Sequence, residues 1–292
     1  MTASSSRRQA LIALVLMSLI WSFNWIVMKR VLHFIGPLDF SALRTVFGTV
    51  LLFVLLRWRG ESLAPTPWRD TLLIGVAQTA AFQLLVQVAL VEGGAGKIAL
   101  LAYTMPFWVI AFAWLLLGDR PGPRQWACLA LAAVGLVLVI EPWVALGSLQ
   151  SCGLALAGGC CWGIGTVLTK RLFRRAAVSP LRVTAWQSLF GTFAVVGVAL
   201  LTNERAIDWS GELIAALVYN GVFAAAIAWA LWLFVVNRLP AGIAGIASLA
   251  TPLLGVLFAW ILLGEVPDVA ELIGIMFIAA ALLGVLQPRA AR

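Results

Sequence analysis

The sequence predicts an all-α integral membrane protein whose ten transmembrane helices form two inverted five-helix repeats around a central cavity. The composition is the first observation, because 63% of the 292 residues are hydrophobic, only 11% are charged, and the mean hydropathy is +1.03. A soluble domain has about 25% charged residues. Apolar runs of about 20 residues, the length of a spanning helix, recur along the chain, and one long stretch occurs twice.

The duplicated stretch defines the domain organisation. Residues 106–121 read PFWVIAFAWLLLGDRP and residues 252–267 read PLLGVLFAWILLGEVP, which are identical at eight of sixteen positions at an offset of 146. A repeat of this length indicates two copies of a multi-helix unit, which we place at residues 1–145 and 146–292. Each copy holds an odd number of spans, so the second must enter the membrane from the opposite side, and the repeat is predicted to be inverted.

The ten spans follow from the charge-free runs. Seven runs are long enough alone or nearly so, and three shorter ones, at 45–56, 125–140 and 272–288, reach a full span with their flanks. We expect spans near residues 10–28, 38–57, 71–91, 97–117, 124–140, 151–169, 183–202, 213–236, 241–263 and 270–287. The connecting loops are short, so no soluble domain is expected.

The basic residues predict the orientation. Fifteen of the 20 Lys and Arg residues fall on the side of the N-terminus, and the opposite loops hold only Lys29, Arg30, Lys97 and Arg205. This bias predicts that both termini are cytoplasmic. The net charge of +8 does not indicate a nucleic-acid partner, because the basic residues lie in short gaps between spans rather than on one soluble face. The expected partners are the lipid bilayer and a small molecule.

The paired motif resembles that of a known family. In each copy a proline lies inside the apolar run, which ends in Gly, an acidic residue and a second proline. These residues are Pro106, Gly118, Asp119 and Pro121, then Pro252, Gly264, Glu265 and Pro267. Over essentially the whole chain, the sequence resembles the EamA branch of the drug/metabolite transporter superfamily, and within it the bacterial exporters of aromatic amino acids.

That resemblance implies an inner-membrane exporter of amino acids that acts as a monomer. It implies a basket-like bundle with a cavity lined mainly by spans 1, 3, 4, 6, 8 and 9, and with spans 5 and 10 packed away from it. The same fold also accommodates the alternative function, proton-coupled efflux of cationic drugs or of another small metabolite.

Candidate substrate-binding residues are the aromatic and polar side chains inside the spans. Trp21, Asn24 and Trp25 share one face of the first span, and an unpaired amide in lipid is costly, so this face is expected to line the cavity. A tryptophan belt at the membrane surface is the alternative. The sixth span offers Trp162 and Thr166, the third Gln78 and Gln83, the fourth Tyr103 and Pro106, the eighth Tyr219 and Asn220 followed by Trp229 and Trp232, and the ninth Ser248 and Pro252.

Several of these assignments stay open at the level of sequence. The glutamines of the third span either line the cavity or form interhelical hydrogen bonds, and they cannot all share one face. Each proline frees a carbonyl one turn earlier, near Ala102 and Ser248, which either meets a substrate ammonium or marks a packing kink. Arg44, inside the second span, either pairs with Asp39, extends to the surface, or belongs to the site.

The absence of a carboxylate in mid-span predicts a passive facilitator, because a proton-coupled carrier usually has an intramembrane carboxylate that titrates from both sides. No HExxH or GxSxG motif and no paired mid-span aspartates occur, and the only histidine is His33, in a predicted loop. No enzyme activity, cofactor or metal site is therefore expected. A receptor or scaffold is a third alternative, and the inverted repeat argues against it.

Overall fold

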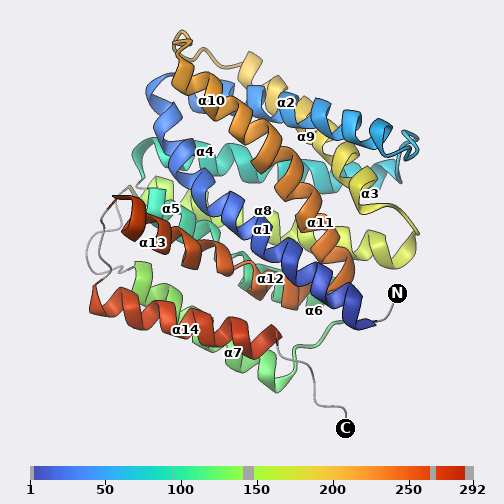
Figure 1. The fold of residues 1–292 in the computed structure, drawn as a ribbon, viewed down its shortest axis with the longest axis vertical. Coiled ribbons are helices and arrows are strands. Elements are labelled where there is room, and N and C mark those ends of the chain that lie inside the picture. The colour runs from blue at the N-terminus through green and yellow to red at the C-terminus, as the bar shows by residue number, and fades with distance from the viewer. Residues whose placement is uncertain (1–2, 94, 141–147, 264–267, 287–292) are drawn as a thin grey trace.

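The computed structural model describes residues 3–93, 95–140, 148–263 and 268–286, and within these ranges all regular elements are helices (Figure 1). The predicted boundary between the repeats at 145/146 and the motif residues Gly264, Glu265 and Pro267 lie outside the described residues. The first half contains α1 (Ala3–Arg30), η1 (Val31–His33), α2 (Pro37–Trp58), α3 (Trp68–Ile74), η2 (Gly75–Ala81), α4 (Phe82–Glu92), α5 (Ala95–Ala102), α6 (Met105–Leu117) and α7 (Pro123–Ile140). The second half contains α8 (Leu149–Arg175), α9 (Pro180–Leu200), α10 (Gly211–Tyr219), η4 (Asn220–Ile227), α11 (Ala228–Arg238), α12 (Ala241–Ala247), α13 (Ala250–Leu263) and α14 (Val269–Leu286).

These elements fall where the sequence places the spans. Among the described residues, seven helical stretches are long and apolar enough to cross a membrane, and each coincides with a predicted span. Three shorter apolar stretches, Pro123–Leu138, Ala241–Gly255 and Leu272–Val285, coincide with the other three. The all-helical membrane fold is confirmed, whereas the count of ten crossings stays a prediction.

Helix ends have local causes. Pro37 and Pro180 begin α2 and α9, where a missing N–H costs nothing because the first turn has no intrahelical acceptor. The side chains of Ser179 and Ser210 accept backbone N–H groups at the starts of α9 and α10. Gly118, at φ 69°, ends α6 in the left-handed conformation that glycine adopts without strain.

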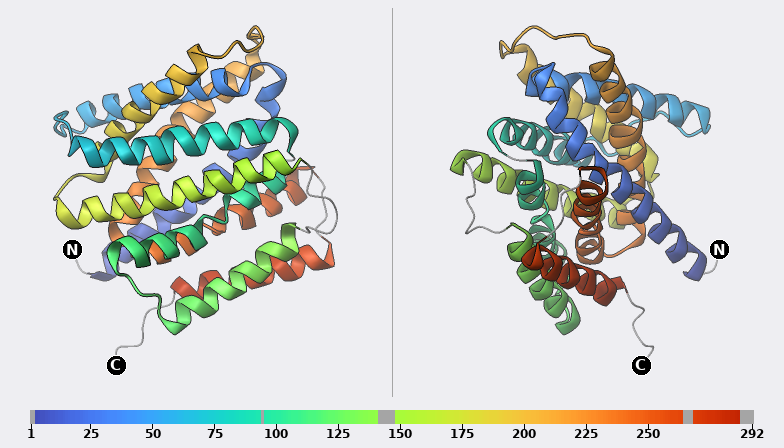
Figure 2. Two further views of the ribbon diagram at one scale, coloured as in Figure 1. Left: turned by 180° about the vertical axis from the view of Figure 1, so that it is seen from behind. Right: turned by 60° about the vertical axis from the view of Figure 1, so that its left-hand side comes forward.

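Two helices lie apart from the rest of the bundle. α7 and α14 pack side by side along one edge, while α1, α8 and α11 cross the middle (Figures 1 and 2). The resemblance implied that spans 5 and 10 pack away from the cavity, and α7 and α14 do lie apart from the helices that cross the middle. Both nevertheless reach the wall of the larger cavity at one end of the bundle, α7 through residues 123–125 and α14 through Val285.

The fourth and ninth spans are broken rather than kinked. α5 ends at Ala102 and α6 starts at Met105, while α12 ends at Ala247 and α13 starts at Ala250. The prolines lie near the middle of these spans, as the sequence predicts, and the packing kink left open there is a short break in the helix. Proline lacks the backbone N–H donor and crowds the preceding turn. In each of the two spans the helix is therefore interrupted and starts again just before Pro106 or Pro252.

The third and eighth spans each contain a π-helical segment, which the sequence did not predict. η2 covers 75–81 and η4 covers 220–227. The two segments therefore occupy equivalent positions in the two repeats, at the offset of the duplicated motif. π-Helical turns concentrate at functional sites because they redirect side chains within an otherwise regular helix. They accordingly alter which residues of these spans face inward.

Glycines allow the halves to interlock. A Cβ on Gly75 of η2 would lie 2.4 Å from the Gln187 carbonyl oxygen of α9, and one on Gly48 of α2 would lie 2.6 Å from the Ala225 Cβ of η4. The crossings join spans 3 and 7 and spans 2 and 8. Each contact connects one repeat to the other, and the two contacts are equivalent under the repeat. Close backbone approach at small residues is typical of helix packing in membranes.

Candidate functional site

Four tryptophans from both repeats meet in the middle of the bundle. Trp162 of α8 lies edge-on to Trp21 of α1, with ring centroids 5.0 Å apart, and stacks on Trp229 of α11 at 5.4 Å. Trp232 contacts Trp21 and Trp162, and Phe82 lies 4.3 Å from Trp162. All five rings are at most 8% exposed. This depth excludes the alternative of a membrane-surface belt for Trp21 and Trp162.

A small pocket adjoins this cluster, and we call it the tryptophan pocket. Its volume is about 40 Å³, enough for about three water molecules at roughly 10–15 Å³ each. The lining residues are Trp21, Asn24, Trp25 and Met28 of α1, Arg44 of α2, Phe82, Gln83 and Val86 of α4, Tyr103, Trp162 of α8, Ala224 and Ala225 of η4, and Trp229 of α11. The described conformation is thus closed around the site.

Six of the predicted residues line the tryptophan pocket: Trp21, Asn24, Trp25, Gln83, Tyr103 and Trp162. The first three do so from one face of α1, as their spacing predicts. Trp229 also lines the pocket, whereas the sequence did not indicate Phe82 or Val86. Apolar residues carry no distinguishing signal in a span that is apolar throughout.

Polar groups occupy one side of the pocket. Arg44 donates from Nη2 to Gln83 Oε1 at 2.6 Å and from Nη1 to Asn220 Oδ1 at 3.1 Å. Arg44 is 6% exposed, so it neither extends to the surface nor forms an ion pair with Asp39. Those two alternatives are wrong, and Arg44 belongs to the pocket wall.

The remaining predicted residues lie outside the tryptophan pocket. Gln78 donates to Thr166 Oγ1 at 2.9 Å, which ties η2 to α8. Tyr219 donates its hydroxyl proton to the Ile20 carbonyl at 2.7 Å, which ties α10 to α1. Asn220 touches the pocket only through Arg44. For Gln78 and Thr166, the interhelical alternative therefore describes the structure.

The carbonyls freed by the prolines contact other parts of the protein. A Cβ on Gly159 would lie 2.8 Å from the Ala102 oxygen, so this carbonyl packs against α8. The Ser248 carbonyl accepts the Thr251 N–H at 2.9 Å, and the Ser248 hydroxyl bonds back to Gly245. Pro106 and Pro252 themselves do not line the tryptophan pocket.

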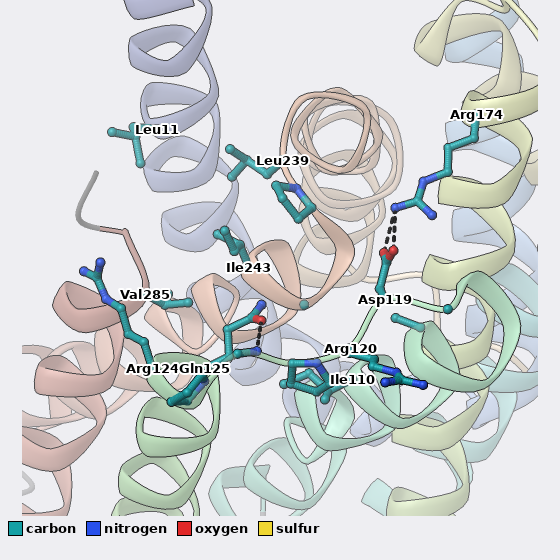
Figure 3. A pocket seen from close by; sticks show the side chains of 17 residues that line it. Leu11, Ile110, Asp119, Arg120, Arg124, Gln125, Arg174, Leu239, Ile243 and Val285 are labelled. Carbon is teal, nitrogen blue, oxygen red and sulfur yellow. Dashed lines mark hydrogen bonds and ion pairs between the residues drawn. The ribbon is translucent and has the colours of Figure 1, made fainter. Parts of the chain in front are cut away.

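A larger cavity opens at the end of the bundle that carries the start of α1, and we call it the vestibule. Its volume is about 840 Å³, and its wall includes Leu11, Val285, the 118–125 segment, Leu239, Pro240, Gly242 and Ile243 (Figure 3). Ten residues of α1, about 15 Å of helix, separate Leu11 from Trp21 in the tryptophan pocket. Met17, which lies between them, is fully buried. The ninth span, which was expected to line the central cavity, therefore lines the vestibule and not the tryptophan pocket. The second span, which was not expected to line the cavity, contributes Arg44 to the tryptophan pocket.

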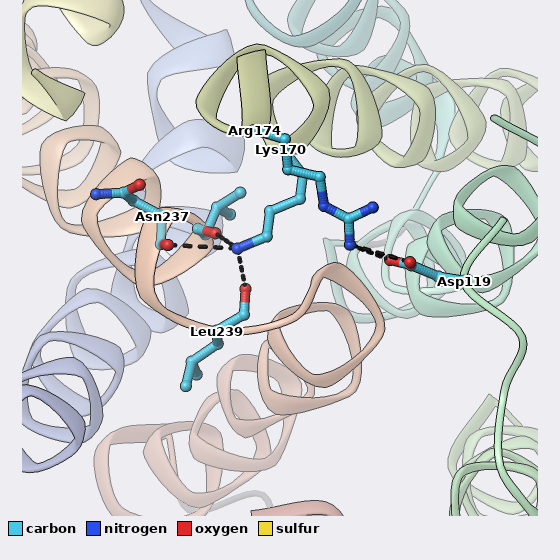
Figure 4. A network of polar contacts seen from close by, with 6 residues as sticks. Asp119, Lys170, Arg174, Asn237 and Leu239 are labelled. Carbon is cyan, nitrogen blue, oxygen red and sulfur yellow. Dashed lines mark hydrogen bonds and ion pairs between the residues drawn. The ribbon is translucent and has the colours of Figure 1, made fainter. Parts of the chain in front are cut away.

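The acid of the first motif lies at the rim of the vestibule. Asp119 accepts from Arg174 of α8 at 2.7 Å (Figures 3 and 4). Both side chains are more than a third exposed, and exposed ion pairs contribute only about 0–1 kcal/mol. The pair links the two repeats but does not hold them together.

Two lysines repeat one interaction, which we call the lysine clamp. Lys29 at the end of α1 donates to carbonyls at the end of α4. Lys170 near the end of α8 donates to carbonyls at the end of α11, as Figure 4 shows. A helix C-terminus carries partial negative charge, so an ammonium group is stabilised there. The acceptors are Leu90 at 2.6 Å, Gly93 at 3.0 Å and Val91 at 3.5 Å for Lys29, and Val236 at 2.9 Å, Leu239 at 2.8 Å and Asn237 at 3.3 Å for Lys170. These acceptors correspond at the offset of 146.

Comparisons with known proteins agree with the duplicated architecture. The sequence model of the EamA-like transporter family matches residues 8–141 and 150–287. The uncharacterized transporter YoaV of Bacillus subtilis (strain 168) is 22% identical over 284 residues, covering 94% of this chain and 95% of its own. A probable amino-acid metabolite efflux pump of Salmonella typhimurium is 26% identical over 291 residues, 95% of this chain and 94% of its own. A solved crystal structure shares the fold with a TM-score of 0.79 at 20% identity, covering 97% of this chain and 99% of its own.

Proposed function

The chain belongs to the EamA-like transporter family, and from this premise we propose that it exports amino acids, aromatic and other neutral ones, by alternating access. The two matched repeats and the membrane-length helices make it a multi-pass membrane transporter. The name of the Salmonella relative, a probable amino-acid metabolite efflux pump, supports this substrate class. We also propose that the protein transports as a monomer.

The observation that carries the proposal is the convergence of tryptophans from both repeats on one pocket. Trp21 comes from the first repeat, and Trp162 and Trp229 come from the second. Indole faces give an aromatic substrate a large contact area, and they attract an ammonium group electrostatically. Because the wall is divided between the repeats, a relative movement of the repeats opens or closes it.

The described conformation is interpreted as closed at the site and open at the vestibule. A pocket for a small ligand usually measures about 300–1,000 Å³, so the tryptophan pocket must widen before an aromatic amino acid enters. The vestibule already has this size. We propose that a substrate passes from the vestibule to the tryptophan pocket as the rings separate, and leaves at the other end.

An inverted repeat supplies the second conformation. If the repeats exchange conformations, a cavity open to one side becomes a cavity open to the other. The lysine clamps support this arrangement, because they join equivalent elements in the two halves. The paired helix breaks and the paired π-helical segments support it in the same way.

We place the vestibule on the cytoplasmic side of a bacterial inner membrane. Its wall contains Arg120, Arg124 and Arg174, and the positive-inside rule assigns such a concentration of Arg to the cytoplasm. Both termini then face the cytoplasm, since Leu11 and Val285 line the same cavity. Export begins from this side.

Transport is proposed to be passive. No carboxylate lines the tryptophan pocket, whose only charged group is Arg44, and a guanidinium stays protonated at physiological pH. A fixed positive charge also disfavours the alternative substrates, cationic drugs. The proposal includes no catalytic step.

The test is counterflow in proteoliposomes preloaded with unlabelled amino acid. Labelled tryptophan and phenylalanine should accumulate transiently, well above the level in empty liposomes. An imposed pH gradient should leave the initial rate unchanged within about twofold. If no amino acid moves, the proposed substrate class is wrong; if a proton gradient drives concentrative uptake, the passive mechanism is wrong.

A further inference from the structure

Arg44 is a buried cation without a buried anion. It is 6% exposed, and its described partners are the neutral amide oxygens of Gln83 and Asn220 and the ring of Phe40, whose centroid lies 5.6 Å from the guanidinium carbon. Its Nε is buried and has no hydrogen-bond partner. Two ion pairs among the described side chains, Arg30 with Glu212 and Arg174 with Asp119, lie elsewhere.

Such an arrangement is costly unless something completes it. A buried charge that lacks a counter-charge loses several kcal/mol of solvation, and amide dipoles replace only part of it. Asp39, the carboxylate nearest in sequence, lies five residues earlier on α2, about 140° around the helix. The tryptophan pocket, by contrast, is lined by Arg44 itself.

Packing alone does not require the charge. The position equivalent to Arg44 in the second repeat is Gln187, which is fully buried on α9. A neutral amide therefore occupies the same place in the other half, although its polar atoms have no partners there. The positive charge is specific to the side of the molecule on which the pocket lies.

We infer that Arg44 binds the carboxylate of the transported substrate, so that the tryptophan pocket selects carboxylates attached to an aromatic or apolar body. The inference rests on the proposed function and names the substrate group that the pocket recognises. A guanidinium presents its N–H groups as a planar fork that matches the two oxygens of a carboxylate. The free Nε and the Nη groups provide this fork once the hydrogen bond from Arg44 to Gln83 or Asn220 is broken.

A second unpaired atom places the amino group. Asn24 lines the same pocket, is 6% exposed, and its Oδ1 is buried without a partner, while its Nδ2 lies 2.9 Å from the weak acceptor Met28 Sδ. An amide oxygen accepts hydrogen bonds from an ammonium group. With the carboxylate at Arg44, the ammonium at Asn24 and the side chain among the tryptophans, the pocket fits an α-amino acid rather than an amine or a simple acid.

The test compares ligands that differ only in the headgroup. Displacement of labelled tryptophan from the protein in nanodiscs is measured with tryptophan, its methyl ester and tryptamine as competitors. In the wild type, both compounds without a carboxylate should bind at least tenfold more weakly than tryptophan. Equal binding of the methyl ester and tryptophan would overturn the inference and leave the proposed function intact.

The matched variants are Arg44→Gln, which copies Gln187, and Arg44→Lys, which keeps the charge. Arg44→Gln should weaken tryptophan binding about 10- to 100-fold, the loss expected for a hydrogen bond to a charged group, and should change methyl ester binding less than threefold. Arg44→Lys should retain part of the preference for the carboxylate. Equal losses for both ligands would assign Arg44 to packing.

Two outcomes remain to be distinguished. If Arg44→Gln does not fold, as judged by size-exclusion chromatography, the comparison of wild-type ligands still decides the inference. If the wild type binds no indole compound and transports no amino acid, the proposed function fails first. Amino-acid transport without discrimination of the carboxylate defeats only the role of Arg44.

Discussion

The crossing of η2 and α9 yields a quantitative prediction about packing between the repeats. A Cβ on Gly75 would lie 2.4 Å from the Gln187 carbonyl oxygen and 3.1 Å from the Gly191 backbone nitrogen. Ordinary Cβ contacts begin near 3.4 Å, so Gly75→Ala must move the two backbones apart by about 1 Å. Neither obstacle is a flexible side-chain end, and both belong to the other repeat.

The magnitude follows from two opposing effects. Overpacking a well-packed site costs about 1–3 kcal/mol, and replacing glycine by alanine within a helix returns about 0.5–1 kcal/mol. We expect Gly75→Ala to lower the free energy of unfolding by about 0–2.5 kcal/mol, the difference between these two effects. The matched control is Gly197→Ala on α9, where an added Cβ meets nothing within 4 Å, and this variant should gain about 0.5–1 kcal/mol.

The assay is reversible unfolding by SDS in mixed micelles, with the apparent melting temperature as a second measurement. If Gly75→Ala proves as stable as Gly197→Ala, the helices do not approach as closely as the structure has them. The double variant Gly75→Ala/Gly191→Ala adds a further condition. One separation of the helices relieves both clashes, so its cost should be smaller than the sum of the single costs.

Three further predictions concern the other contacts. Lys29→Met and Lys170→Met remove equivalent clamps, and each should lower the free energy of unfolding by about 1–3 kcal/mol. In SDS titrations the two losses should agree within about 1 kcal/mol, and a larger difference would contradict the equivalence of the clamps. Trp162→Ala deletes the ring at the centre of the cluster; it should lower the free energy of unfolding by about 3–5 kcal/mol and abolish most of the counterflow of tryptophan. Trp209→Ala, at an exposed ring, should leave the counterflow rate within about twofold of the wild type. Equal effects of the two substitutions on counterflow would place the site elsewhere. Glu204→Ala removes the carboxylate that accepts two N–H groups at the start of α2 and should cost about 0.5–2 kcal/mol, and an unchanged melting temperature would refute this capping role.

The positions of the spans could be predicted because the hydrocarbon core of a membrane imposes a length and a lack of charge that the sequence shows directly. The inward face of α1 could also be predicted, since Trp21, Asn24 and Trp25 combine aromatic and amide groups at helical spacing. The helical geometry of the third and eighth spans could not be predicted. A π-helical turn shifts the face of every later residue, and nothing in 75–81 or 220–227 distinguishes it from an α-helix.

The roles of individual polar residues could not be predicted either, because the sequence does not identify their hydrogen-bond partners. Gln78 and Gln83 differ little as sequence features, yet one bonds to Thr166 and the other to Arg44. Arg44 had three open interpretations, which only the neighbouring helices could separate. The prolines drew attention to the helix interruptions, but the carbonyls next to them are used within the fold rather than offered to a ligand.

The comparison between the repeats assigns mechanism and specificity to different residues. The lysine clamps, the helix breaks and the glycine crossings occur in both halves, as a mechanism that exchanges the halves requires. Arg44 corresponds to Gln187 in the other repeat, so it breaks this symmetry. Substitution at Lys29 or Lys170 should therefore change the counterflow rates of tryptophan and phenylalanine by the same factor, whereas Arg44→Gln should change the ranking of tryptophan against its methyl ester. A clamp variant that alters this ranking, measured by competition in proteoliposomes, would show that mechanism and specificity are not divided in this way.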